Sequence, residues 1–467
     1  MSSSTIESKE GVVLREGERT VQGRFAEFIL ETNYGELSKE VVHRAKRCIL
    51  DFMGVALAGS SVGLAPVIAD MLSLTGGKKE ATIIGDGRRT PALHAALVNG
   101  VRGHTLDMDD GHRYANGHPG VVTIPAVAAL GEREDSRGRE MIEAVVVGYE
   151  IFIRVATAIN PSHLKRGFHT TGTVGPLAAA ASCSKLLGLN GREIASALAI
   201  AGLQGAGLLE VLTSGQMMKP LHAGRAAQAG LMAALLAQEG AEGPELLFEG
   251  EKGFFRAFSD VSTMGDIGSD LGRNFEIRNT YFKLHAACRH VHSALDAVRE
   301  IMDANEVDIN GVRKIEVHTY SVAYQLAGGN REAKTELAAK FSLPVSIGLM
   351  LCCGTAGVDQ YTPEHIANPV VQELAKKVDV IIDKKRDDVY PRERGARVDI
   401  ETSQGAYSAE VNIPKGEPEN PASDDELNEK FFHNAGKVLP AGKATDLLEM
   451  ILHIETASVR ELMSLLH

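Results

Sequence analysis

Cysteine is scarce in this sequence of 467 residues, and it is not spaced for a disulfide or metal framework. No CxxC pair occurs among the five cysteines, which are Cys48, Cys183, Cys288, Cys352 and Cys353. Secreted disulfide scaffolds and iron–sulfur proteins depend on such spacings, so the pattern argues against both classes. We expect a protein of the reducing cytoplasm.

Long apolar runs and long basic runs are also missing. Met141–Ile159 comes closest to a membrane span, but Glu143, Glu150 and Arg154 interrupt it, so a buried helix of a soluble protein is expected. The N-terminus lacks the apolar core of a signal peptide, and residues 1–20 are expected to be a flexible tail. The formal net charge of −12 argues against nucleic-acid and membrane partners.

Helical periodicity is the dominant pattern that is present, from about Arg24 to about Phe258. After about Gly272 the composition changes, and a linker, KGEPENP, precedes a return to helical periodicity at residues 424–466. Between these points lie segments with strand character, at residues 314–320, 378–382, 397–402 and 406–413, the last two joined by a predicted hairpin turn. The pattern predicts a mainly α protein with an α+β second domain.

Titratable residues concentrate in the run GHTLDMDDGHRYANGHPG at residues 103–120. A helix is expected to lead into it, with Thr90 as N-cap and Pro91 as its first residue. His104 continues the apolar face of this helix, and Asp107 is expected one turn later, where it could orient His104. His118 adds a possible base in a segment that cannot be helical before its proline.

Two interpretations of this run remain open. A single His–Asp pair at a helix end is more often a buried histidine satisfied by a carboxylate. Three nearby carboxylates, Asp107, Asp109 and Asp110, repel one another unless water screens them, a cation neutralises them, or one has a raised pKa suited to proton transfer. A reaction centre and a cation-binding protein are therefore both compatible with the run.

Three further clusters carry candidate chemistry. His169 lies in GFHTTGT before a helix, which suits an anion but equally a simple N-cap loop, and the P-loop spacing is absent. Lys219 precedes a helix that is expected to start at Pro220 and to carry His222 and Arg225, which taken alone is typical of a solvated helix start. The segment KLHAACRHVH suits a carboxylate through its cations, or zinc through Cys288 or its histidines, although no complete zinc ligand set is specified. Its candidate residues are Lys283, Cys288, Arg289 and His292.

Together these segments resemble the MmgE/PrpD family, which includes 2-methylcitrate dehydratases, cis-aconitate decarboxylases and iminodisuccinate epimerases. The resemblance runs from about Arg24 to the C-terminus and is carried, in the expected order, by RAKRCILDFMGVALAG, GHTLDMDD with GHPG, GFHTTGTVGPLAAAA, MMKPLHAGRAAQAG and YFKLHAACRHVHSALDA. It implies a large helical domain formed by both chain ends (21–272 and 422–467), an inserted α+β lid domain (273–421) and a homodimer. It also implies catalysis without metal or organic cofactor on a small polycarboxylate.

The resemblance assigns site residues by motif. Asp107 matches the first aspartate of D-x-D-D, His118 the histidine before the following proline, and His169 that of the G-F/W-H segment. Lys219 matches the lysine of the K-P/R-x-H segment, and Lys283 the lysine that opens the lid. These positions line the pocket in characterised members.

Three positions depart from the family pattern. Gly111 follows D-x-D-D where decarboxylases carry a threonine or another side chain. The stretch that resembles H-S-x-x-Y reads FSLPV, so Val345 replaces the tyrosine implicated in decarboxylases and dehydratases. Cys288 stands where animal decarboxylases carry a histidine. The specific reaction is therefore less firmly indicated than the family.

The expected reaction begins with proton transfer at a carbon next to a carboxylate, which requires cations to stabilise the charge that develops. Lys219, Lys283 and Arg289 are expected to hold carboxylates, His118 or His169 to move the proton, and Asp107 to tune a histidine or act as an acid. The remaining expected substrate contacts are His104, Cys288, His292 and Arg225. A hydro-lyase similar to 2-methylcitrate dehydratase is favoured, with an iminodisuccinate-type epimerase or a cis-aconitate-type decarboxylase as alternatives.

Overall fold

The protein is mainly helical with small sheets in the residues that the computed structural model describes, which are 6–7, 13–14, 20–212, 216–260 and 267–467. This agrees with the predicted fold class. Most of the expected N-terminal tail, residues 1–20, lies outside the described residues. Two short segments of it, β1 (Ile6–Glu7) and β2 (Val13–Leu14), pair antiparallel.

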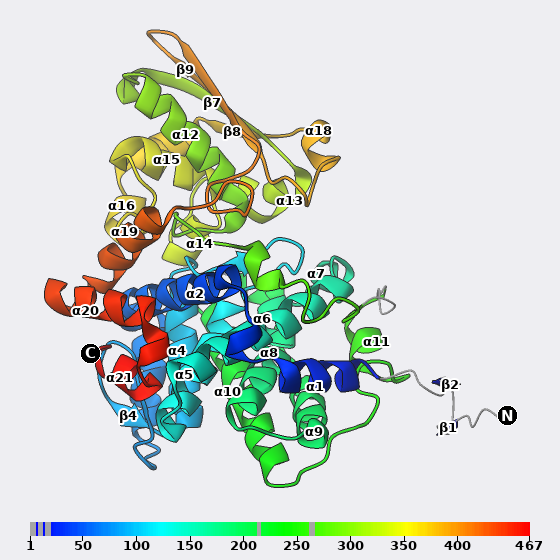
Figure 1. Cartoon of the computed structure of the whole chain (residues 1–467). Coiled ribbons are helices and arrows are strands. Elements are labelled where there is room, and N and C mark those ends of the chain that lie inside the picture. Colours follow the sequence, from blue (N-terminus) through cyan, green and yellow to red (C-terminus); the bar gives the residue numbers. More distant parts are fainter. Residues whose placement is uncertain (1–5, 8–12, 15–19, 213–215, 261–266) are drawn as a thin grey trace.

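We refer to residues 20–272 and 422–467 as the helical region and to residues 273–421 as the α+β region (Figure 1). The helices of the first part of the helical region are α1 (Val21–Glu31), α2 (Lys39–Ala58), α3 (Leu64–Ser73), α4 (Ala92–Thr105), α5 (Gly120–Glu134), α6 (Gly138–Ile159), α7 (Ser162–Lys165), α8 (Thr170–Leu186), α9 (Gly191–Gly202), α10 (Lys219–Gln238) and α11 (Phe254–Phe258). Its short strands are β3 (Ala81–Thr82), β4 (Arg89–Thr90) and β5 (Gly111–His112).

Side-chain caps explain where several of these helices begin. Asn190 accepts hydrogen bonds from the first turn of α9, and Glu193 closes a capping box. The predicted start of α4 is one residue early, because Thr90 belongs to β4 and pairs with Ala81. Pro91 is therefore the N-cap of α4 rather than its first helical residue.

Glycines let α4 and α10 cross closely near the N-terminal half of α10. A Cβ atom on Gly100 would lie 2.8 Å from the Cα of Gly224, and one on Gly224 would lie 2.2 Å from the carbonyl oxygen of Leu97. Real Cβ atoms do not approach other atoms this closely, so any larger residue would push the helices apart. The crossing brings the end of α4 near the start of α10, where Lys219 lies.

The α+β region contains the only four-stranded sheet in the part of the chain that the structure describes, with strand order β10-β9-β7-β8. Its strands are β6 (Thr280–Tyr281), β7 (Val312–Thr319), β8 (Val378–Ile382), β9 (Ala396–Thr402) and β10 (Ala406–Val411). Its helices are α12 (His292–Ala304), α13 (Ser321–Ala323), α14 (Glu336–Lys340), α15 (Leu343–Cys353), α16 (Pro363–Ile366), α17 (Pro369–Lys376) and α18 (Lys384–Asp387). These strands confirm the predicted strand segments to within two residues at each end.

The predicted hairpin joins β9 to β10, which pair antiparallel from Ala406–Glu401 to Val411–Ala396. Buried and exposed residues alternate along β9, as expected for a strand with one face on a core. β7 pairs antiparallel with β9 and parallel with β8. The core of this region forms where α12 and α15 pack with the sheet.

The end of the chain returns to the helical region through α19 (Asp424–Ala435), α20 (Ala441–Leu452) and α21 (Val459–Ser464), which Figure 1 shows in orange to red beside the blue α2. Phe431 of α19 and Phe52 of α2 belong to one hydrophobic core. Lys430 donates a hydrogen bond to buried Asp51 of α2. The first and last segments of the chain thus share a core.

The most apolar predicted helix, Met141–Ile159, forms most of α6 and is almost wholly buried. Its charged residues have internal partners: Glu150 accepts a hydrogen bond from the Ile277 amide at 3.0 Å and pairs with Arg154 at 3.3 Å. Among the described residues no single helix is long and apolar enough to cross a membrane, although α2 and α3 pass that test as a pair bent by 80°.

Candidate active site

A small cavity of about 100 Å³ lies between the helical region and the α+β region. The helical region contributes Asp107, His118, His169 and Lys219 to its lining, and the α+β region contributes Lys283, Cys288, Arg289 and Arg394. Seven of these eight residues were predicted as site residues from the sequence. We refer to this space as the inner cavity.

The end of α4 determines where Asp107 lies. The helix stops at Thr105, and Asp107 adopts a left-handed backbone conformation with φ of 51°. Its carboxylate therefore turns away from His104. It accepts a hydrogen bond from Lys219 at 2.6 Å and forms an ion pair with Lys283 at 3.3 Å. The prediction that Asp107 orients His104 is wrong, because the helix ends before it reaches Asp107.

Three buried lysines hold this turn through successive carbonyl groups. Lys340 donates to Leu106 at 2.9 Å, Lys283 to Asp107 at 2.9 Å, and Lys430 to Met108 at 2.8 Å. Carbonyls at a helix C-terminus have no helical partner and carry partial negative charge, so cations stabilise them. Lys340 and Lys430 come from segments far along the chain, and no local motif marked them.

The charge state of Asp107 follows from these neighbours. Burial opposes ionisation of its carboxyl group, but Lys219 and then Lys283 outweigh burial, so the pKa of Asp107 lies below its ordinary value. One carboxylate oxygen, Oδ2, is buried without a hydrogen-bond partner. A single carboxylate thus faces two lysines, which leaves positive charge in excess.

His118 is held in one tautomer by its neighbours. Its Nδ1 lies 2.6 Å from the carbonyl oxygen of Asp110 and 3.1 Å from a carboxylate oxygen of Asp109. Both atoms are acceptors, so Nδ1 carries the proton. In the neutral ring Nε2 is therefore unprotonated and can accept a proton from a ligand in the cavity.

His104 lies behind the cavity wall rather than in it. Its Nδ1 pairs with Asp109 at 3.0 Å, and its ring lies 5.0 Å from that of His118 and 5.8 Å from that of His169. Burial lowers the pKa of His104 to about 4, so the ring is neutral at pH 7. The predicted substrate contact of His104 is thus corrected to support of the two cavity histidines.

His169 precedes α8 and is buried at the cavity wall. Burial, followed by the charge of Lys219, lowers the pKa of His169 well below its ordinary value. Its Nδ1 lies 3.0 Å from Nδ1 of His222 on α10, so one of the two rings donates and the other accepts. His169 is a neutral imidazole linked to a second, half-buried imidazole.

A raised pKa, one of the three alternatives that the crowded run left open, occurs at Asp110. Burial, followed by the charge of Asp51, raises the pKa of Asp110 to about 7. Its side chain does not line the inner cavity, however, and accepts hydrogen bonds from the Tyr149 hydroxyl and the Gly120 amide at 3.1 Å. Asp110 therefore anchors the start of α5 rather than facing a ligand.

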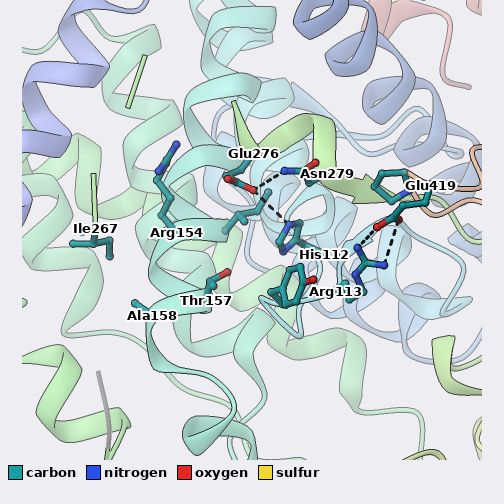
Figure 2. A pocket seen from close by; sticks show the side chains of 12 residues that line it. His112, Arg113, Arg154, Thr157, Ala158, Ile267, Glu276, Asn279 and Glu419 are labelled. Carbon is teal, nitrogen blue, oxygen red and sulfur yellow. Dashed lines mark hydrogen bonds and ion pairs between the residues drawn. The ribbon is translucent and has the colours of Figure 1, made fainter. Parts of the chain in front are cut away.

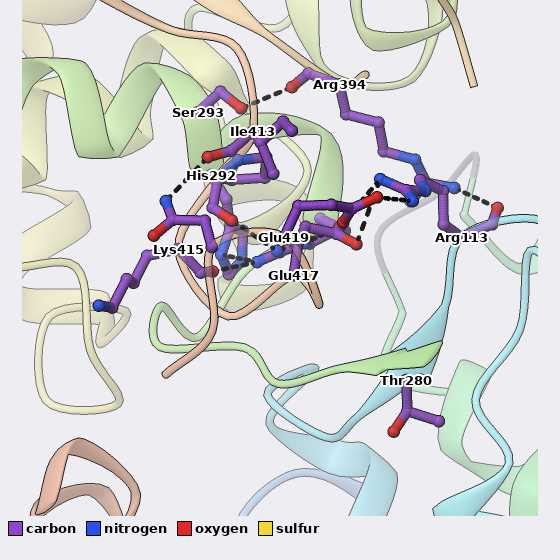
Figure 3. A network of polar contacts seen from close by, with 12 residues as sticks. Arg113, Thr280, His292, Ser293, Arg394, Ile413, Lys415, Glu417 and Glu419 are labelled. Carbon is purple, nitrogen blue, oxygen red and sulfur yellow. Dashed lines mark hydrogen bonds and ion pairs between the residues drawn. The ribbon is translucent and has the colours of Figure 1, made fainter. Parts of the chain in front are cut away.

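Arg289 is fixed by partners on its own region, His292, Lys415 and Glu417, which Figure 3 labels. It donates to Glu417 and to the carbonyl of Lys415, at 3.1 and 3.0 Å, and to Nδ1 of His292 at 3.1 Å. His292 in turn donates through Nε2 to the carbonyl of Ala287. His292 is not among the residues that line the cavity, so the expected substrate contact is corrected to a positioning role for Arg289.

Arg225 is the predicted site residue that lies farthest from its expected place. It follows Lys219 by six residues, which rotates it about 120° away around a helix of 3.6 residues per turn. Its side chain is exposed and donates to Gln228 on the same helix. Arg225 does not line the inner cavity, and the prediction for it is corrected.

The zinc alternative for the KLHAACRHVH segment finds no support in the described residues. Burial raises the pKa of the Cys288 thiol, and His290 bonds the Tyr320 hydroxyl at 2.6 Å. Elsewhere in the described residues, potential metal-ligand atoms lie within 4.8 Å of one another in one group of three side chains, those of His104, Asp109 and His118. In that trio the carboxylate already pairs with both rings.

Arg394 and Tyr281 are cavity residues that the sequence analysis missed. Arg394 is buried and donates to the carbonyl of Arg113 at 2.6 Å. Tyr281 pairs with Gly111 across β5 and β6, and a Cβ atom on Gly111 would lie 2.4 Å from the Tyr281 hydroxyl. The unusual Gly111 is thus the residue that makes room for Tyr281, a link between positions 170 residues apart that no motif reveals.

The other departures from the family pattern also have structural consequences. Val345 is fully buried in the core of the α+β region and contributes nothing to the inner cavity. Phe341, four residues earlier, lines the cavity, and its ring centroid lies 5.5 Å from Nζ of Lys219. The stretch that resembles H-S-x-x-Y therefore presents an apolar ring to the cavity.

A larger pocket of about 730 Å³ is lined in part by His112 and Arg113, which precede His118 in the chain (Figure 2). We refer to it as the outer pocket. Its arginines are already paired, Arg113 with Glu419 and Arg154 with Glu150 and Asp270, and the ring of His112 lies 3.8 Å from a carboxylate oxygen of Glu276. Size alone would select this pocket, but its charges are neutralised within the protein.

Comparisons with known proteins place the chain in a family. The model of the MmgE/PrpD N-terminal domain matches residues 23–265, and that of the MmgE/PrpD C-terminal domain matches residues 285–456. The chain is 28% identical to the cis-aconitate decarboxylase-like protein oryM of Aspergillus oryzae, over 96% of this chain and 98% of that protein. It is also 28% identical to human cis-aconitate decarboxylase, over 94% and 92% of the two chains.

A more distant relative is the mitochondrial 2-methylcitrate dehydratase of Yarrowia lipolytica, with 23% identity over 88% of this chain and 83% of that protein. Relatives of both lyase types thus align with most of the chain. The two domain models together span the helical region and the α+β region on either side of the inner cavity. The chain belongs to the MmgE/PrpD family.

Proposed function

We propose that the protein is a lyase that binds a small polycarboxylate in the inner cavity and removes a proton from a carbon next to a carboxylate, as a hydro-lyase does. The single observation that carries this proposal is that two acceptors hold Nδ1 of His118, a residue on the wall of a cation-rich cavity, so that Nε2 of the neutral ring is the atom left to accept a proton. A neutral imidazole in that state is a general base.

Substrate carboxylates are assigned to Lys219 and Lys283, while Arg289 stays paired with Glu417 and adds positive charge to the cavity wall. Proton removal next to a carboxylate places a second negative charge on that group, and fixed cations in a water-poor site stabilise this charge strongly. The two lysines are oriented in advance by Asp107 and Arg289 by Glu417, so little reorganisation is required. Arg394 adds a further cation to the same wall.

Dehydration also requires a group that protonates the departing hydroxide. We assign this role to His169, whose link to His222 can supply the proton. In the free protein burial favours the neutral form of His169. A bound polyanion favours the charged form of a neighbouring imidazole, so substrate binding raises the ability of His169 to carry the proton.

Decarboxylation is the second candidate, and the similarity to cis-aconitate decarboxylases favours it. The same cations would bind the substrate, carbon dioxide would leave, and a histidine would protonate the resulting carbanion. The replacement of the family's tyrosine by Val345 weakens this candidate and dehydration alike. Epimerisation would use the two histidines to remove and return one proton.

One experiment separates these reactions. The metal-free protein is incubated in D₂O with 2-methylcitrate, citrate, cis-aconitate or iminodisuccinate and followed by proton NMR. A hydro-lyase gives an unsaturated acid with loss of the hydroxyl group, a decarboxylase gives an acid one carbon shorter, and an epimerase gives deuterium exchange with inversion. No exchange and no product from any of these acids would contradict the proposal.

The lid role of the α+β region and a cytoplasmic homodimer are further parts of the proposal, and the family resemblance supports them. A lid is supported by its contribution of Lys283, Arg289 and Arg394 to a cavity shared with the helical region. Light scattering coupled to size-exclusion chromatography measures the mass, which we expect to be twice the chain mass of 49.9 kDa.

A further inference from the structure

Two imidazole rings share one carboxylate beside the inner cavity. Oδ2 of Asp109 lies 3.0 Å from Nδ1 of His104 and 3.1 Å from Nδ1 of His118, and Oδ1 lies 3.1 Å from Nδ1 of His104. Asp109 and His104 are buried, whereas His118 lines the cavity. One carboxylate thus contacts a ring that can face a ligand and a second ring that cannot.

The charge of Asp109 opposes an effect of the cations in the cavity. Four cations line the same space as His118: Lys219, Lys283, Arg289 and Arg394. Positive charge disfavours the protonated form of an imidazole, so the groups that attract a substrate carboxylate also weaken a histidine base. Asp107 offsets little of this effect, because two lysines share its carboxylate. Asp109, by contrast, contacts the ring of His118 directly.

His169, the other histidine of the cavity, has no carboxylate partner among the described residues. Its Nδ1 lies 3.0 Å from another imidazole, that of His222. Burial, followed by the charge of Lys219, lowers the pKa of His169 well below its ordinary value. A base benefits from a higher affinity for the proton and an acid from a lower one, so these two environments suit His118 as base and His169 as acid.

His104 helps to keep the shared carboxylate ionised. Burial opposes ionisation of Asp109, but His104 and then His118 outweigh burial, so the pKa of Asp109 lies well below its ordinary value. Nε2 of His104 is buried without a hydrogen-bond partner. Among the described residues, Asp109 is therefore the hydrogen-bond partner of the His104 ring.

We propose that Asp109 is a positioning residue whose negative charge makes His118 an effective base, and that His104 acts on the base through Asp109. When Nε2 of His118 accepts the substrate proton, the electron pair of the C–H bond stays with the substrate and the ring becomes an imidazolium. Asp109 stays ionised and stabilises this cation across the Nδ1 hydrogen bond. The inference rests on the proposed function and gives roles to two side chains outside the cavity lining.

The test removes the charge and keeps the shape. Asp109→Asn can place an amide oxygen at the position of Oδ2, where it accepts from both rings. NMR titration of the full-length protein labelled with ¹⁵N-histidine, with His118→Gln to identify the His118 signals, needs no substrate. We expect the midpoint for protonation of His118 to move to lower pH in Asp109→Asn, because loss of a negative charge disfavours the imidazolium. An unchanged midpoint would overturn the inference.

The matched control is Asp110→Asn. The Asp110 carboxyl group accepts from the Gly120 amide and the Tyr149 hydroxyl, not from an imidazole. Its loss should move the His118 midpoint much less than Asp109→Asn does. Equal movement in the two variants would mean that local negative charge in general, rather than the contact with Asp109, sets the base, and would overturn the inference.

Kinetics give a second readout, which a merely structural role would not move. Asp109→Asn is expected to lower kcat by about 10–100-fold, as for loss of a charge-assisted hydrogen bond. The acid-side fall of kcat/KM, which reports protonation of the base in the free protein, should move to lower pH. Other titratable groups of the lining, Tyr281, Cys288 and His290, are neutral at pH 7, because burial raises the pKa of the first two and lowers that of the third. A lower kcat with an unmoved acid-side fall would overturn the inference.

Two variants of His104 keep the test open if Asp109→Asn does not fold. His104→Phe keeps a ring but removes the donor, so Asp109 should take up a proton more readily and the His118 midpoint should fall. His104→Gln can donate through its amide and should restore part of the wild-type midpoint. Wild-type midpoints in both variants would contradict the proposed path through Asp109.

The outcomes also separate this inference from the proposed function. If an acid is turned over but Asp109→Asn keeps the wild-type kcat and pH profile, the proposed function stands and the inference fails. If the His118 midpoint falls in Asp109→Asn while no acid is turned over, the role of Asp109 stands and the reaction assignment fails.

Discussion

The inner cavity and the outer pocket are both lined by residues of one loop, 111–118, and they differ in charge balance more than in residue type. The outer pocket is about seven times larger and contains histidine, arginine and glutamate, but its cations pair with carboxylates of the protein (Figure 2). In the inner cavity one carboxylate, Asp107, faces both Lys219 and Lys283.

This difference shows that unbalanced charge, rather than volume, marks the place for an anionic ligand. A paired arginine gains little from a new carboxylate, because the existing ion pair must first be broken. Buried lysines that share one carboxylate still have donors to offer, since each ammonium group has three hydrogens. Substitutions in the inner cavity should therefore change activity more than substitutions in the outer pocket.

Removal of the proposed base, His118, should reduce activity more than any other substitution considered. His118→Ala is expected to lower kcat by about 10²–10⁴-fold, the usual contribution of general base catalysis, with little change in thermal unfolding. Glu276→Gln, in the outer pocket, is the matched control and should retain activity. Unfolding of the His118 variant would instead assign the residue a structural role, and full activity would exclude it as the base.

Loss of a cation in the inner cavity should cause the second-largest decrease in activity. Lys283→Met is expected to lower kcat/KM by about 10–100-fold, because a charge-assisted hydrogen bond to a carboxylate is worth about 1.5–3 kcal/mol. Glu419→Gln, which alters the ion pair of Arg113 in the outer pocket, should change kcat/KM far less. Similar losses in the two variants would remove the distinction between the two spaces.

Steric contact across the loop gives a prediction for stability. Gly111→Ala is expected to lower the free energy of unfolding by about 1–3 kcal/mol, because the new Cβ atom would overlap the Tyr281 hydroxyl. In a Tyr281→Val background the same change should cost much less. Chemical denaturation of the four proteins measures this coupling, and strictly additive effects would contradict the contact.

The smallest expected effect concerns the pH dependence of stability. Burial, followed by the charge of Arg113, lowers the pKa of His112 to about 3. Between pH 6.5 and about 3 the unfolded chain therefore binds a proton that the folded protein does not, so acidification destabilises the fold. In the His112→Asn variant the free energy of unfolding should fall less steeply as the pH is lowered. An unchanged pH dependence would contradict the neutral state of His112 in the folded protein.

Local sequence patterns predicted much of the fold and the helical half of the site. Hydrophobic periodicity was sufficient for the mainly helical character of the first half of the chain, and strand pattern with turn residues for the β9–β10 hairpin, since both depend on neighbouring residues. The density of histidines and aspartates at residues 103–120 correctly indicated His118 and Asp107 as cavity residues.

Other features depend on the three-dimensional path and could not be read locally. Because the backbone at Asp107 is left-handed, its carboxylate pairs with two lysines distant in sequence, Lys219 and Lys283, instead of the expected partner His104. Arg394 reaches the cavity from the strand-rich region, and the space for Tyr281 depends on Gly111. The prediction for Arg225 was wrong for a related reason. Arg225 is near Lys219 in sequence but lies on another side of α10.

A crystal structure with tricarballylate, a polycarboxylate without a hydroxyl group to eliminate, would show where an anionic ligand binds. We expect a carboxylate within hydrogen-bond distance of Nζ of both Lys219 and Lys283, with an adjacent carbon facing Nε2 of His118. Tricarballylate bound in the outer pocket against His112 and Arg113, with the inner cavity free of ligand, would contradict the account.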